Sequence, residues 1–71
     1  DENFADAGRF IINTQRATIG ALQRKYKLGF NRAARIMDQL CEAGVVSDGE
    51  GTKERHILMS IEQFEEYLGS R

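Results

Sequence analysis

The sequence predicts a small, mainly α-helical domain that carries one short β-hairpin. Three observations support this class: apolar residues recur at helical spacing in four segments, a glycine-containing turn separates the second segment from the third, and two short apolar runs flank a Gly-rich turn. Two helices joined by a short turn with Gly form a helix-turn-helix, and a following hairpin gives the winged form. We therefore expect a winged helix-turn-helix with a three-helix core, a wing and an additional C-terminal helix.

The core helices are marked by apolar periodicity and by residues that favour helix ends. They are expected at residues 3–14, 19–26 and 30–43. Asn3 and Thr18 precede the first two helices, and their side-chain oxygens can accept hydrogen bonds from free backbone N–H groups. We expect Gly29 to take a left-handed backbone conformation in the turn and Gly44 to end the third helix.

The C-terminal part of the chain predicts the wing and a last helix. The expected boundaries are 45–47 and 53–59 for the two strands and 48–51 for the turn between them. Ser60 and Gln63 have the spacing of a capping box, which predicts a helix within residues 60–71. We expect one domain over the whole chain, with residues 3–59 as its core and the last helix as an extension.

Charge is distributed unevenly along the chain, although the formal net charge is only −1. Residues 7–37 contain no Asp or Glu and hold seven of the ten Lys and Arg residues. A positive block on a nearly neutral domain is typical of a surface that faces phosphates. The plain alternative is a solvated face with ordinary lysines and arginines.

The start of the third helix carries the residues that best fit base reading. Asn31, Arg35 and Asp38 are spaced at i, i+4 and i+7 and therefore share one stripe of the helix, next to Arg32. Asn can pair with adenine through two hydrogen bonds and Arg with guanine, and each good pair contributes roughly 1–3 kcal/mol of discrimination. Asp38 either accepts from a cytosine amino group or orients Arg35 through an ion pair, and we favour the ion pair. The alternative for all four is an ordinary polar surface.

A second group of residues fits phosphate contacts, which position a protein on DNA without specifying the sequence. This group comprises Arg16, Thr18, Gln23, Arg24, Lys25, Lys27, Lys53 and Arg55. Thr18 is equally well explained as a helix cap alone. The wing tip contains Asp48 and Glu50, which phosphates repel, so we expect weaker contact from the wing than from the helices.

Several other classes of protein have little support in the sequence. The single cysteine excludes an intrachain disulfide and favours a reducing compartment, and no apolar run approaches a membrane span or a signal peptide. Cys41 is expected in the core and His56 on the surface, so neither a metal site nor a nucleophile with its base is expected. No phosphate-binding glycine loop is present, and we expect neither a cofactor nor enzyme activity. Because the chain begins at Asp1, we expect it to be part of a longer protein.

Two segments closely resemble the C-terminal gamma domain of FtsK/SpoIIIE-type DNA translocases. They are Leu-Gln-Arg-Lys at residues 22–25 and Gly-Phe-Asn-Arg-Ala-Ala-Arg at residues 29–35. The resemblance extends over residues 4–58, and the segment 60–71 lies beyond the typical end of the domain. Asp38 stands where the family usually has the longer glutamate.

The resemblance implies a winged helix tethered to a hexameric, ATP-driven motor that is absent from this chain. Several such domains sit side by side on one short, polar, G-rich DNA site that directs the motor along the chromosome. The implied base readers are Asn31, Arg32 and Arg35, and the supporting positions are Arg16, Gln23, Arg24 and Lys25. In some bacteria the domain also contacts a tyrosine recombinase. We expect a cytoplasmic domain that does not touch the membrane, in a parent protein anchored in the inner membrane by a separate N-terminal region.

Two other functions remain open at this point. A transcriptional regulator would use the same helix-turn-helix but as a dimer on palindromic sites. A winged helix can also serve only protein contact, with the positive block facing an acidic partner.

Overall fold

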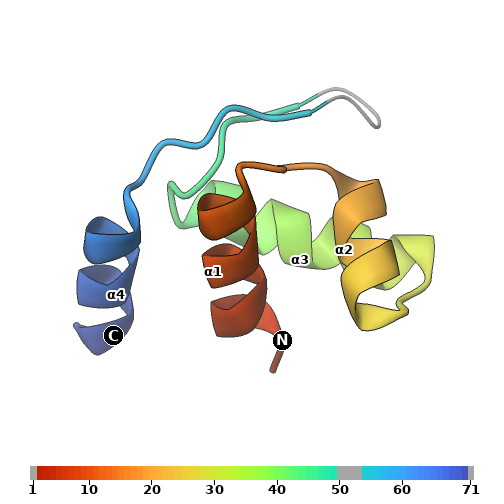
Figure 1. Ribbon diagram of the computed structural model, residues 1–71, viewed down its shortest axis with the longest axis horizontal. Coiled ribbons are helices and arrows are strands. Elements are labelled where there is room, and N and C mark those ends of the chain that lie inside the picture. Colours follow the sequence, from red (N-terminus) through yellow and green to blue (C-terminus); the bar gives the residue numbers. More distant parts are fainter. Residues whose placement is uncertain (1, 50–53, 71) are drawn as a thin grey trace.

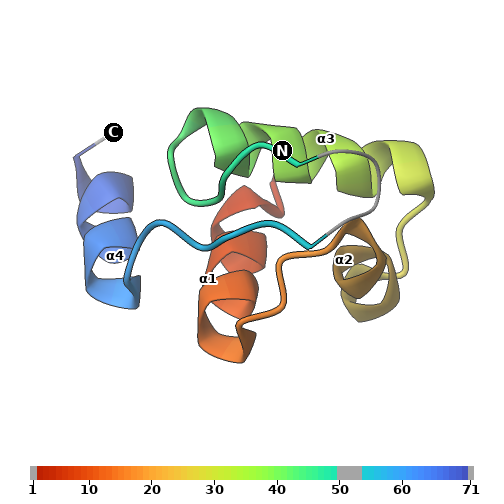
Figure 2. The ribbon, with the colours of Figure 1, turned by 90° about the horizontal axis from the view of Figure 1, so that it is seen from above.

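Four helices form over residues 2–49 and 54–70, the parts of the chain that the computed structural model describes. They are α1 (Phe4–Thr14), α2 (Ile19–Tyr26), α3 (Phe30–Glu42) and α4 (Ile61–Gly69). α1 lies in the middle, with α4 at one end of the domain and α2 at the other (Figures 1 and 2). α3 packs across α1 and α2, and α4 packs on α1. The predicted helices are confirmed, with boundaries that differ by a few residues at most.

Local hydrogen bonds explain where two of the helices begin. The Thr18 hydroxyl accepts a hydrogen bond of 3.1 Å from the N–H of Ala21, which caps α2. At α4, the Ser60 hydroxyl accepts from the N–H of Gln63 at 3.1 Å, and the Gln63 side chain accepts from the N–H of Ser60 at 2.8 Å. The caps predicted at Thr18 and Ser60 are confirmed, because a cap depends only on residues within one helical turn. The side-chain cap predicted at Asn3 is wrong: Asn3 stands at the N-cap position of α1, but its side chain makes no capping hydrogen bond.

The turn between α2 and α3 differs from the prediction. Gly29 is extended, with φ −70°, and serves as the N-cap of α3. The left-handed residue is Lys27, with φ 55°, whose N–H donates to the carbonyl of Gln23 at the end of α2. The prediction for Gly29 was therefore wrong. The left-handed conformation that closes a helix occurs here at Lys27, the residue directly after α2 and two positions before Gly29. Gly44 has φ 86° after α3, as expected.

The expected hairpin forms one antiparallel bridge, between Val46 and Ile57, and the described residues contain no strand. The N–H of Ser47 donates to the carbonyl of His56 at 2.9 Å, but the N–H of His56 donates to the Ser47 hydroxyl at 3.0 Å. A regular ladder would return that bond to the Ser47 carbonyl. The N–H of Arg55 donates to the carbonyl of Ala17, outside the hairpin. The diverted His56 donor interrupts the ladder, whereas the N–H of Arg55 lies at a position that faces away from the partner segment. Residues 50 and 51 of the turn expected at 48–51 lie outside the described residues.

The return segment nevertheless shows the alternating burial of a strand over residues 54–59. Arg55, Ile57 and Met59 are half-buried, whereas the three residues between and before them, Glu54, His56 and Leu58, are exposed. One side of this segment therefore faces the domain and the other faces solvent.

The core brings together residues from all four helices and from the segments before α2 and after α3. Its largest fully buried side chains are Phe64, Ile11, Leu22, Ile36, Met37, Leu40, Val45 and Val46. Phe64 joins α4 to this core and packs against Phe4 of α1 with the two rings tilted by 51° and their centroids 6.0 Å apart. The ring fills the space above Gly8, where an added Cβ would lie only 2.3 Å from the Phe64 Cζ atom. Gly8 weakens α1 as an isolated helix, but it provides the space that α4 occupies.

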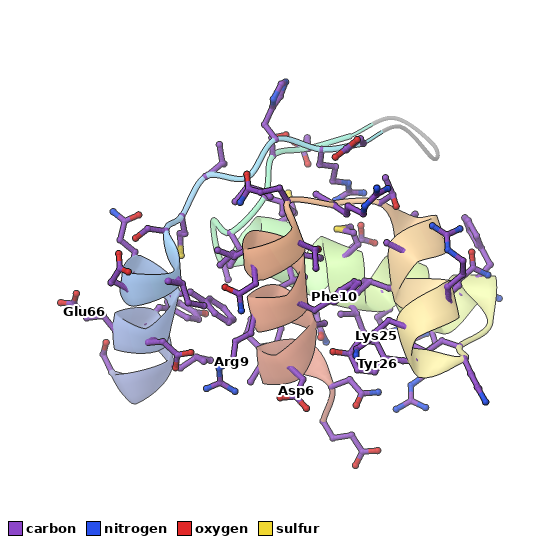
Figure 3. The ribbon with its side chains drawn as sticks, in the orientation of Figure 1. Asp6, Arg9, Phe10, Lys25, Tyr26 and Glu66 are labelled. Atoms are coloured by element: carbon purple, nitrogen blue, oxygen red, sulfur yellow. The ribbon has the colours of Figure 1, made fainter. Side chains whose placement is uncertain are left out.

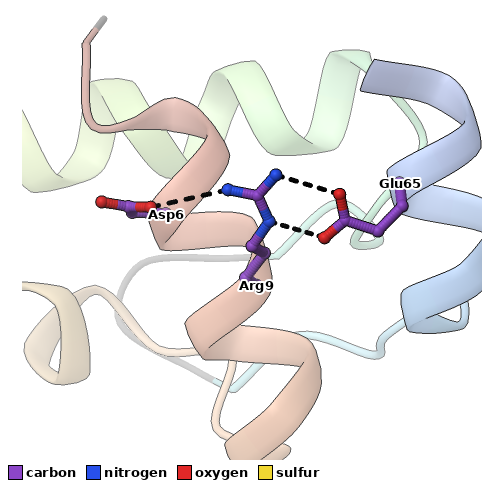
Figure 4. A network of polar contacts seen from close by, with 3 residues as sticks. All are labelled: Asp6, Arg9 and Glu65. Carbon is purple, nitrogen blue, oxygen red and sulfur yellow. Dashed lines mark hydrogen bonds and ion pairs between the residues drawn. The ribbon is translucent and has the colours of Figure 1, made fainter. Parts of the chain in front are cut away.

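An ion-pair network on the surface joins α1 to α4 (Figure 4). The Arg9 guanidinium donates two hydrogen bonds to the Glu65 carboxylate, at 2.6 and 2.9 Å, and lies 3.6 Å from Asp6. The hydrogen bonds from Arg9 hold the pKa of Glu65 below its ordinary value. Because these groups are exposed, the buried Phe64 contributes more to the docking of α4 than they do.

Candidate nucleic-acid interface

The stripe of α3 that faces away from the core carries the predicted base readers. Asn31, Arg35 and Asp38 are exposed, and the core-facing side of the helix holds Ala33, Ile36, Met37 and Leu40. Asn31 and Arg35 have no hydrogen-bond or ion-pair partner from their side chains within residues 2–49 and 54–70. Their amide and guanidinium groups are therefore available to an external acceptor or donor.

Asp38 and Arg32 have internal partners that the sequence did not predict. Asp38 lies 3.6 Å from the Arg55 guanidinium, so the expected ion pair with Arg35 is wrong. Arg32 lies on a flank of the stripe, 3.6 Å from the Glu2 carboxylate, at the start of α1. The structure thus keeps Asn31 and Arg35 together and directs the other two side chains toward neighbouring segments.

Three of the predicted phosphate-binding cations surround an open hollow of about 450 Å³ between α1 and α2. Its lining residues are Phe10, Arg16, Ala21, Arg24 and Lys25. The Lys25 ammonium lies over the Phe10 ring, 5.7 Å from its centroid, and the Phe10 ring contacts Tyr26 edge-on (Figure 3). No acidic side chain pairs with these three cations within the described part of the chain. The Phe10 ring thus helps to hold Lys25 in place, and the three cations make the hollow suitable for an anion.

Phe10 is the member of this hollow that the sequence analysis missed. It recurs at helical spacing with the other apolar residues of α1, and its half-buried ring packs against the core. The position of its ring beneath Lys25 depends on how α1 meets α2, for which no local sequence signal exists.

The remaining phosphate candidates differ in availability. Lys27 is exposed and Gln23 is half-buried, and both lie beside the turn that precedes α3. Thr18 uses its hydroxyl as a helix cap. The Arg55 side chain is only 8% exposed and pairs with Asp38, so a phosphate contact would require it to leave that partner. Lys53 lies outside the described residues.

The lone cysteine and the lone histidine are not part of a possible metal site within the described residues. Cys41 is half-buried at the edge of α3 rather than fully in the core, and its thiol donates to the Asp48 carboxylate at 3.1 Å. This bond, together with burial, raises the pKa of Cys41. His56 is exposed as expected, and the described residues contain no group of ligands that could hold a metal ion. None of the four helices is both long and apolar enough to span a bilayer, judged over those same residues.

Comparison with known proteins gives a family match and several similar proteins. A family model, that of the FtsK gamma domain, matches residues 1–60. The DNA translocase FtsK of Chlorobaculum tepidum is 44% identical over 68 residues, 96% of this chain and 8% of that protein. FtsK of Clostridium acetobutylicum is 51% identical over 59 residues, 83% of this chain, and the DNA translocase SpoIIIE of Bacillus subtilis is 41% identical over 66 residues, 93% of this chain.

Each of these relatives is much longer than the chain, which spans 8% of their length. The alignment with the Chlorobaculum protein covers 96% of the chain and therefore extends into α4. The family model itself ends at residue 60, in agreement with the expectation that residues 60–71 extend beyond the typical domain, whereas the similarity to this relative continues further. Because the family model matches residues 1–60, this chain belongs to the FtsK gamma domain family.

Proposed function

We propose that this domain binds double-stranded DNA in a sequence-specific manner and thereby orients an FtsK/SpoIIIE-type translocase on short, polar, G-rich sites. The observation that carries the proposal is the pairing of two surfaces: Asn31 and Arg35, free on the outward stripe of α3, and the acid-free cationic hollow beside α2. The first surface suits base edges in the major groove and the second suits the phosphates that border it.

The rest of the proposal concerns the assembly around this surface. The whole chain acts as one winged-helix domain, with residues 45–59 as its wing, and it carries out no catalysis itself. The motor is a hexamer supplied by the same longer protein, on the cytoplasmic side of a bacterial inner membrane. A tyrosine recombinase is a further candidate partner, by analogy with the family.

The test is a selection of bound duplexes from a random pool, followed by titrations on the selected site and a scrambled one. Arg35→Ala is expected to bring the two affinities together, because a lost guanine pair removes roughly 1–3 kcal/mol of discrimination. Lys25→Ala is expected to weaken both duplexes about equally and to reduce the slope of log affinity against log salt by about 1.

Arg9→Ala is the matched control, because it removes one positive charge at the α4 end and leaves α2 and α3 unchanged. We expect it to bind both duplexes nearly as the unaltered domain does. An unchanged preference in Arg35→Ala would contradict the assignment of the reading surface. A palindromic preferred site would favour a dimeric regulator instead, and no salt-dependent duplex binding would favour protein contact alone.

A further inference from the structure

Arg55 is covered to an extent that is unusual for its residue type. Its side chain is 8% exposed, whereas Arg is almost never covered unless it is paired. Its chain lies against Gly49, where an added Cβ would lie 2.8 Å from both Cγ and Nε of Arg55. Its guanidinium reaches Asp38 on α3 at 3.6 Å.

The backbone of Arg55 contacts a third segment. Its N–H donates a hydrogen bond of 3.0 Å to the carbonyl of Ala17, immediately before α2. One residue therefore connects the segment before α2, the segment after α3 and α3 itself. Beside it, the Cys41 thiol of α3 donates to Asp48, so the segment at 48–49 is held against α3 at two neighbouring points.

We infer that Asp38 and Arg55 form an internal strut that fixes residues 45–49 and 54–58 against α3, and that Asp38 supports DNA binding by holding Arg55 and not by reading a base. In this assignment, which rests on the proposed function, Asp38 is a positioning residue and Arg55 is not a phosphate ligand. The strut also explains why an acid is tolerated on the stripe that carries Asn31 and Arg35. A carboxylate facing phosphates is repelled, whereas one paired with a guanidinium is largely neutralised.

The first arm of the test uses the free domain and needs no DNA. Amide hydrogen exchange is measured at Ser47, Arg55 and Leu58, whose N–H groups hold the segment in place. Asp38→Asn and Arg55→Met are each expected to accelerate exchange at these amides about threefold or more. The double variant is expected to exchange no faster than the faster of the two single variants. Normal protection in Asp38→Asn would overturn the strut. Glu62→Gln, an exposed acid on α4, is the control and should leave these amides unchanged.

The second arm measures duplex affinity at a temperature where every variant is fully folded, so that a loss of global stability does not affect it. Asp38→Asn is expected to weaken all duplexes by a common factor of about threefold, although it removes a negative charge from the DNA-facing stripe. In the Arg55→Met background the same change should strengthen binding, because only the charge effect remains. Arg55→Lys keeps the cation and should recover at least half of the affinity that Arg55→Met loses.

Two binding results would overturn the inference. One is a loss of preference at a single base pair in Asp38→Asn, which would make Asp38 a direct base reader. The other is stronger binding of all duplexes in that variant with Arg55 intact, which would make Asp38 a simple like charge. If the unaltered domain binds no duplex, the proposed function fails, and the amide exchange still decides whether the strut exists.

Discussion

The two ends of this domain use charge in opposite ways. At the α4 end, the Arg9 guanidinium is engaged by Glu65 and Asp6, so the cation is satisfied within the molecule. At the α2 end, three cations gather around one hollow with no acid among the described residues to pair with them. The first arrangement ties helices together, and the second leaves positive charge for an external partner.

The hollows at the two ends make the same contrast. One of about 470 Å³ lies between α1, α3 and α4, with Glu2, Glu42 and Tyr67 in its lining. The other, of about 450 Å³, is lined by Arg16, Arg24 and Lys25 beside Phe10. Two hollows of similar size thus carry opposite charge in a chain of net charge −1. The distribution of charge, and not its total, decides which partner each end can attract.

Removal of the Phe64 side chain is the strongest way to test whether the α4 end serves stability and the α2 end serves binding. Phe64→Ala is expected to lower the free energy of unfolding by about 3–5 kcal/mol, because a fully buried ring is replaced by a cavity. Urea unfolding measures the loss. If the α4 end serves stability alone, the fraction that remains folded keeps the duplex affinity of the unaltered domain, and a parallel loss of affinity would contradict the division.

Gly8→Ala tests the same contact from the α1 side. The added methyl would meet the Phe64 ring at 2.3 Å, so the ring must move, and we expect a loss of about 1–3 kcal/mol from overpacking. Helix propensity alone predicts the opposite sign, a gain of up to about 1 kcal/mol. Gly20→Ala on α2 is the matched control, because the nearest atom to its added Cβ is a flexible Arg24 terminus at 3.5 Å. A stabilised Gly8→Ala would show that α4 does not dock as described.

Acid should weaken the α4 end specifically. Because hydrogen bonds from Arg9 lower the pKa of Glu65 in the folded state, Glu65 stabilises the fold above its ordinary pKa. That contribution is lost as the pH falls through the lowered value, so we expect the melting temperature to fall between about pH 5 and pH 3. Glu65→Gln should show a smaller fall over this range. Glu66→Gln, whose side chain points away from α1 (Figure 3), should behave as the unaltered domain does.

The smallest expected effect concerns the Cys41 thiol at the edge of α3. The hydrogen bond to Asp48 favours the protonated thiol and raises its pKa, so alkylation at neutral pH should be slow. Asp48→Asn is expected to accelerate alkylation by iodoacetamide a few-fold, with the rate followed as a function of pH. Asp6→Asn on α1 is the control, because the charged side chains that act on the thiol are those of Asp48, Arg55 and Asp38. Equal rates in Asp48→Asn and the unaltered domain would exclude the bond.

Features that depend on neighbours in sequence were predictable. The four helices, the caps at Thr18 and Ser60 and the glycine after α3 follow from patterns within one or two helical turns. The outward stripe with Asn31 and Arg35 follows from helical periodicity, which places it opposite the apolar side.

Features that depend on distant segments were not predictable in the same way. From local sequence, Gly8 is expected only to destabilise α1. Its role in making space for the ring of Phe64 depends on a residue from the far end of the chain. Asp38 has Arg35 within reach by helical spacing, yet it pairs with Arg55 because the return segment passes that side of α3. The ladder of the hairpin ends because a side-chain hydroxyl of Ser47 takes a backbone bond, a competition that strand periodicity does not reveal.

The neighbouring residues Arg9 and Phe10 give α1 a particular mechanical role. One residue step turns a helix by about 100°, so the first side chain reaches Glu65 on α4 and the second reaches Tyr26 and Lys25 on α2. Contacts on two sides therefore fix the rotation of α1 about its own axis. A rotation of α1 that shortens the Arg9 contact with α4 must therefore lengthen the Phe10 contacts with α2, and the reverse rotation has the opposite effect.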